Sequence, residues 1–87
     1  MKLCKIKMKK ELKRIICNRI IELRKKHGLK MEQLALQSGI SKGGLSEIER
    51  YKKQPQIFTI TKICAGLGIT LQEFFSYKEI NKFTDQL

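Results

Sequence analysis

An 87-residue chain can form one domain with a modest core, but it has no room for a separate catalytic domain. Its formal net charge of +11 favours a polyanionic partner, because basic side chains that neutralise phosphates release counterions. Of the 19 Lys and Arg, 12 lie in residues 1–30, so the excess charge is expected on an N-terminal arm and a first helix, unless it is only a solvated basic face.

The N-terminal segment disfavours a secreted or membrane-spanning protein. Residues 1–14 are charged throughout and lack the apolar core of a secretory signal. No run approaches the ~20 apolar residues of a membrane span. A helix lying on a membrane surface is an alternative use of the basic N-terminus, but the motif described below makes nucleic acid the better polyanion.

The chain has three widely spaced cysteines: Cys4, Cys17 and Cys64. An odd set of this kind predicts a reducing, cytoplasmic location and no disulfide framework. Together with His27, these cysteines lack the short spacing of a zinc site, so we expect no metal and no cofactor. Cys17 and Cys64 are expected to serve as small core residues.

The N-terminal third is expected to hold a charged, mobile arm and one helix. The arm is residues 1–10. Apolar side chains recur at three- and four-residue spacing over residues 11–26, which predicts an amphipathic helix there. Gly28 is expected to end this helix, because glycine readily adopts the left-handed conformation of a C-terminal cap.

The next segment is typical of two short helices around a tight turn, with expected ranges 31–37 and 42–50. Gly39 permits the positive φ that a sharp turn needs, and Ser41 is expected to cap the second of these helices. Ala35 should let the two helices cross closely. A helix-turn-helix of this kind inserts its second helix into the major groove of DNA, so the motif and the charge predict the same partner.

Two further helices and a tail complete an all-α prediction. A polar loop over residues 51–56 precedes a helix expected at 57–66, where Gly66 and Gly68 mark the end. Thr70 and Glu73 form a capping box that opens a fifth helix. Apolar residues in the tail form one stripe if the tail is helical: Tyr77, Ile80, Phe83 and Leu87.

The order GL, EQLA, SGIS, LSEIER, P and KICAGLGITLQEFF resembles the phage lambda repressor and Cro type of helix-turn-helix, also called the xenobiotic response element family. The resemblance covers about residues 16–75. It implies a five-helix DNA-binding domain, here residues 11–76, between the basic arm 1–10 and the tail 77–87. It also implies a repressor that acts as a dimer on a palindromic operator.

The resemblance assigns the site by position. The third helix would be the recognition helix, with Lys42, Gly43 and Glu47 where base edges are read, and Gly44 and Ser46 where neighbouring contacts are made. Further DNA contacts are expected around it: Met31, Ser41 and Lys52. Phosphate contacts are expected from some of the basic residues of the arm and first helix: Lys5, Lys7, Lys9, Lys10, Lys13 and Arg14.

The chain departs from the family pattern at its site. Gly43 and Gly44 stand inside the recognition helix, where each glycine costs ~1 kcal/mol relative to alanine and supplies no reading side chain. Met31 replaces a glutamine that often touches phosphate, and Tyr51 replaces a common glycine. Two main readers remain: Lys42, which suits guanine O6 and N7, and Glu47, which suits cytosine N4.

Arg24 and Glu49 match a buried pair that is common in the family and ties the first helix to the third. We expect these two residues to stabilise the fold without reading DNA. No set of nucleophile, base and orienting group is present, so we predict no enzyme and no small-molecule ligand.

The leading hypothesis is a sequence-specific transcriptional regulator, a repressor in the cytoplasm. It would act as a homodimer through the fifth helix or the apolar tail, unless the stripe of the tail folds back onto its own core. The alternatives are a protein-interaction module with weak DNA reading and an antitoxin that represses its own operon.

Overall fold

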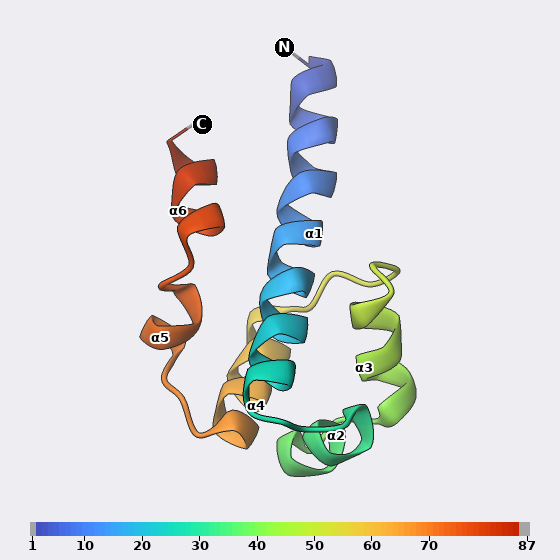
Figure 1. The fold of residues 1–87 in the computed structure, drawn as a ribbon. Helices are drawn as coiled ribbons and strands as arrows, with labels where there is room; N and C mark the ends of the chain where they lie inside the picture. Colours follow the sequence, from blue (N-terminus) through green and yellow to red (C-terminus); the bar gives the residue numbers. More distant parts are fainter. Residues whose placement is uncertain (1, 86–87) are drawn as a thin grey trace.

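The computed structural model describes the backbone of residues 2–85 and the side chains of residues 7–85. Expectations for Cys4, Lys5 and Leu87 therefore lie outside the described side chains. The described residues form six helices and no strand, as an all-α prediction requires (Figure 1). The helices are α1 Lys2–Lys26, α2 Met31–Ser38, α3 Lys42–Glu49, α4 Ile57–Leu67, α5 Leu71–Phe75 and α6 Lys78–Thr84.

Helix α1 differs from its predicted extent. It begins at Lys2 and runs for 25 residues, so residues 2–10 continue the helix that was expected to start at residue 11. Lys, Leu and Met are good helix formers, and no Gly or Pro interrupts the chain before Gly28. At 1.5 Å per residue the helix is about 37 Å long, and its first turns stand beyond the end of the other helices (Figure 1).

Helices α2 and α3 form the expected helix-turn-helix. Gly39 has a φ of 69°, and its N–H donates to carbonyls of the last turn of α2. The Ser41 side chain caps α3 by accepting a hydrogen bond of 2.9 Å from the Gly44 N–H. The predicted turn and cap are therefore confirmed.

The crossing of α2 and α4 corrects the prediction for Gly66. This residue does not mark the end of α4, which continues to Leu67 and ends at Gly68 with a φ of 72°. A Cβ at Gly66 would collide with Ser38 Oγ and would lie 3.0 Å from backbone atoms of Gln37 and Ser38. The glycine is therefore needed because the two helix backbones touch there.

Within the described residues the tail folds back onto its own domain, which is the alternative that the sequence left open to a dimer contact through the apolar stripe. Helix α6 packs along α1 and buries Ile80 and Phe83. Arg19 on α1 secures this arrangement. Its Nε donates to the carbonyl of Phe74 at 2.8 Å, and its guanidinium stacks 4.9 Å from the centre of the Tyr77 ring.

The core lies between α1, α2, α3 and α4, is completed by Phe74 of α5 and Ile80 of α6, and includes Cys17 and Cys64 as predicted. Burial raises the pKa of both thiols, so they remain protonated and behave as small apolar side chains. Within the described residues, no helix is long and apolar enough to cross a membrane.

Candidate nucleic-acid interface

Helix α3 has two different faces. Leu45 and Ile48 are buried against the core, and this contact fixes the rotation of the helix. Lys42, Gly43 and Glu47 are consequently turned to the opposite side, where Gly44 and Ser46 are their neighbours. The structure thus brings together on one surface the positions that were expected to read bases.

Lys42 is held by a partner that the sequence did not indicate. Its Nζ donates a hydrogen bond of 2.8 Å to Oε1 of Glu32 on α2. This bond lowers the pKa of the Glu32 carboxyl below its usual value. Both side chains remain mostly exposed, so the pair contributes little to stability. The ion pair instead positions Lys42, because it draws the ammonium of this residue toward the start of α2.

The two glycines of α3 differ in the space around them. A Cβ at Gly44 would lie 3.0 Å from Ser41 Oγ, so glycine leaves room for the capping hydrogen bond. A Cβ at Gly43 would meet no atom within 4 Å, so packing does not require glycine there. Gly43 instead leaves a gap in the exposed surface between Lys42 and Glu47.

Tyr51 stands where the family pattern commonly has glycine, and its side-chain contacts show how a tyrosine is accommodated there. Its φ is 62°, a left-handed conformation that favours glycine. The tyrosine hydroxyl donates to Asn18 Oδ1, and the Arg14 guanidinium lies 5.4 Å from the centre of the ring. Beside it, Cys17 Sγ lies 3.8 Å from the carbonyl oxygen of Lys53. These contacts fasten the α3–α4 loop to α1.

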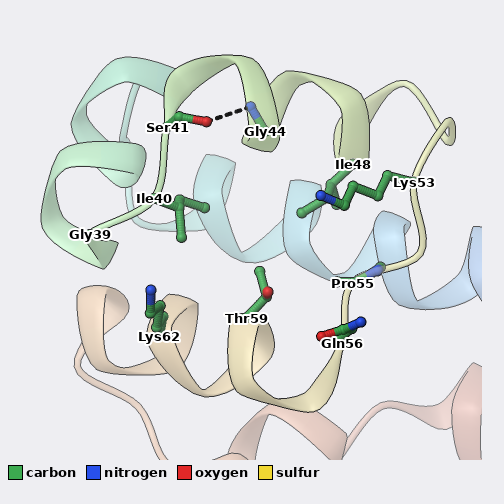
Figure 2. A pocket seen from close by; sticks show the side chains of 10 residues that line it. All are labelled: Gly39, Ile40, Ser41, Gly44, Ile48, Lys53, Pro55, Gln56, Thr59 and Lys62. Carbon is green, nitrogen blue, oxygen red and sulfur yellow. Dashed lines mark hydrogen bonds between the residues drawn. The ribbon is translucent and has the colours of Figure 1, made fainter.

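A polar cleft of about 400 Å³ lies beside α3, between the α2–α3 turn and the start of α4 (Figure 2). Lys53 and Lys62 lie on its edges, and Ser41 forms part of its wall. The first turn of α4 also faces the region, and its N-cap residue, Gln56, makes no side-chain hydrogen bond to it. Ammonium groups and uncapped N–H groups are suited to a phosphate.

The other expected contacts occupy varied positions. Lys9, Lys10, Arg14 and Lys52 are exposed, and Lys13 is half-buried. Met31 is half-buried and packs against the core, so its side chain supports α2.

Arg24 and Glu49 meet as an ion pair inside the domain. Arg24 Nε donates to Glu49 Oε2 at 2.7 Å, and Nη2 donates to Oε1 at 2.9 Å. The remaining Nη1 donates to the carbonyl of Leu29 at 2.8 Å. The side chains are 15% and 7% exposed, respectively, so neither faces the surface of α3. The pair joins α1 to α3 and thereby orients the exposed face.

Apolar side chains on the surface are a feature that the sequence did not reveal. Leu36, Ile57 and Phe58 are more than half exposed, and Leu71 on α5 is 37% exposed. Lys62 partly covers the Phe58 ring, with its Nζ 4.7 Å from the ring centre. Within the described residues, no three His, Cys, Asp or Glu side chains are placed to hold a metal ion.

Known proteins share this architecture. The sequence profile described as "Helix-turn-helix" (HTH_3) matches residues 20–74. The transcriptional regulator SutR of Escherichia coli is 34% identical over 65 residues, which are 75% of this chain and 36% of that protein. The control protein C.MunI of Mycoplasma sp. is 42% identical over 60 residues, which are 68% of this chain and 81% of that protein.

Two solved structures have the same fold. An HTH_3 family transcriptional regulator from Vibrio cholerae superposes with a TM-score of 0.72 at 37% identity, over 77% of this chain and 38% of that one. A mutant of the restriction-modification controller protein C.Esp1396I also superposes with a TM-score of 0.72, over 86% of this chain and 89% of that one. The two sequences are 24% identical, so this match concerns the fold alone. The chain spans about a third of the length of the E. coli regulators SutR and PuuR.

Proposed function

This chain belongs to the lambda repressor-like helix-turn-helix family of transcriptional regulators, which are not enzymes, and we propose that it regulates transcription by binding a specific DNA sequence with α3. The observation that carries the proposal is the exposed face of α3. Buried Leu45 and Ile48 turn Lys42, Gly43 and Glu47 outward, on a helix narrow enough for the major groove.

Lys42 and Glu47 are the base readers in this proposal. One N–H of the Lys42 ammonium is used by Glu32, and its other donors are available to guanine O6 and N7. Glu47 accepts from cytosine N4. Gly43 supplies no side chain between them, so the floor of the groove can approach the helix backbone at that point.

Phosphate contacts come from the surface next to α3. The cleft beside α3 receives one phosphate between Lys53, Lys62 and the first turn of α4. Lys52 contacts the same strand from the α3–α4 loop. These contacts hold the protein in register on the duplex but carry no sequence information.

We further propose a homodimer that acts as a steric repressor on a palindromic site in the cytoplasm. The described part of the tail stripe is already covered by α1, so α5 is the better interface, with Leu71 as its exposed apolar residue. A two-fold dimer would separate the recognition helices by about 34 Å, one turn of DNA. Sedimentation should show a dimer for the wild type and a monomer for Leu71→Lys; a dimer in both would place the interface elsewhere.

Selection from a library of random DNA duplexes tests the function. We expect a defined sequence to be enriched and to form two inverted half-sites if the protein binds as a dimer. Enrichment of unrelated sequences with equal affinity would contradict specific regulation and favour a module that has kept the fold without reading DNA.

A further inference from the structure

We propose that the first turns of α1 form a rigid basic extension that lies along duplex DNA outside the segment covered by α3, with Lys7, Lys10 and Arg14 on successive phosphates. The inference rests on the proposed function, since α3 must dock first. It replaces the flexible arm with a helix of fixed direction, and it assigns the contacts to one face of that helix.

Helical spacing defines the face. Lys7, Lys10 and Arg14 stand three and four residues apart, so their side chains lie on one side of α1. Lys9 precedes Lys10 by one position and is therefore turned about 100° away from it. All four of these residues are exposed.

The α3–α4 loop shows which way this face points. The Arg14 guanidinium lies over the ring of Tyr51, the residue that precedes Lys52 and Lys53 in the loop. The face of α1 that carries Lys7 and Lys10 is therefore continuous with the basic loop that borders α3. Figure 1 shows the loop returning toward the middle of α1, with the first turns of the helix extending past it.

The reach of the extension follows from helix geometry. Lys7 lies seven residues before Arg14, which corresponds to about 10 Å along the axis. Base pairs are stacked about 3.4 Å apart, so the extension spans roughly three further base pairs. Helix α6 lies beside the N-terminal half of α1 (Figure 1), where Glu11, Ile15 and Phe83 line a shared hollow, but Lys7 and Lys10 remain exposed.

Lys7 and Lys10 form no ion pair within the described residues, and Glu11, four residues after Lys7, lines the hollow that α1 shares with α6. Like charges on neighbouring turns repel one another and weaken a helix. Phosphates would remove this repulsion, so a DNA strand is a suitable partner for this face.

Alanine insertions between Lys10 and Glu11 test the proposal without changing any charge. Two alanines rotate Lys7 and Lys10 by about 200°, to the opposite side of the helix, whereas four rotate them by a full turn plus about 40° and move them about 6 Å outward. The probes are the selected duplex trimmed to the half-sites and the same duplex with six more base pairs on each flank. Melting curves verify that each variant is folded.

We expect the wild type to bind the duplex with the flanking base pairs more tightly than the trimmed duplex. The slope of log binding constant against log salt concentration should also become steeper by about 0.9 for each additional phosphate that the protein neutralises. This tightening should disappear with two alanines and return with four. Equal tightening in all three proteins would show a flexible arm and overturn the proposal. No tightening in the wild type would overturn it as well, while failure to bind either duplex would refute the proposed function itself.

Single substitutions provide an independent test in the uninterrupted helix. Lys10→Gln should reduce the salt slope on the flanked duplex by about 0.9, and Lys9→Gln, which removes the same charge from another face, should leave it unchanged. Equal reductions would mean that only the overall charge matters, and the proposed face would be wrong.

Discussion

Removing Arg24 should destabilise the domain strongly, because it leaves a buried carboxylate without a cation. Glu49 is 7% exposed and receives two hydrogen bonds, of 2.7 and 2.9 Å, from Arg24. Breaking such a pair from one side costs about 3–5 kcal/mol. A small domain has a total stability of about 5–15 kcal/mol, so Arg24→Met should lose a large part of it. For a domain of this size, the melting temperature should fall by at least about 10 °C, at roughly 4–8 °C per kcal/mol.

The double variant distinguishes the interaction energy of the ion pair from other destabilising effects of the two substitutions. Glu49→Leu alone strands the Arg24 guanidinium, but Arg24→Met combined with Glu49→Leu removes both charges and should cost less than the sum of the two. Urea unfolding of the four proteins gives the coupling energy. Additivity within about 0.5 kcal/mol would contradict this prediction, since it would mean that the two side chains do not interact in solution.

The other predictions concern single contacts. Tyr51→Phe should lower the free energy of unfolding by about 0.5–1.5 kcal/mol, because Asn18 loses its donor; no change would mean that the hydroxyl contact is not made. Gly66→Ala should destabilise by about 1–3 kcal/mol, although alanine is the better helix former, because α2 and α4 must separate. A higher melting temperature would contradict the close crossing. Glu32→Gln should strengthen binding to all duplexes by removing a negative charge, and it should relax the preference at the base pair read by Lys42; an unchanged preference would show that Glu32 does not position Lys42.

Local signals explain why most of the fold could be predicted from the sequence. Gly39 and Ser41 set a turn and a cap through their own backbone and side-chain chemistry. The capping box of α5 forms as expected, with Glu73 N–H donating to Thr70 Oγ1 at 3.0 Å. Each of these features depends on residues within a few positions of one another, so the order of the chain is sufficient to reveal it.

The remaining features have weak or ambiguous local signals, or depend on contacts between distant segments. The lysine-rich N-terminus has no clear apolar periodicity, yet the helix continues through it because no Gly or Pro interrupts it. The tail stripe is visible in the sequence, but its partner surface on α1 exists only after folding. The bond between Lys42 and Glu32 joins positions ten residues apart across the turn, where no sequence rule pairs them. Gly66 is ambiguous in the sequence because glycine serves both helix ends and close crossings.

The proposed function depends above all on base reading by Lys42 of α3. Its most direct test is the ratio of the Kd values for random and selected duplexes at one salt concentration, compared between the wild type and Lys42→Ala. Lys25→Ala serves as the control, since it removes an equal charge from the exposed end of α1. We predict that Lys42→Ala lowers the ratio about 5- to 150-fold, as expected for the loss of one bidentate base contact, and that Lys25→Ala leaves it unchanged. An unchanged ratio in Lys42→Ala, with binding weakened equally on both duplexes, would contradict base reading by this residue and reduce Lys42 to a phosphate contact.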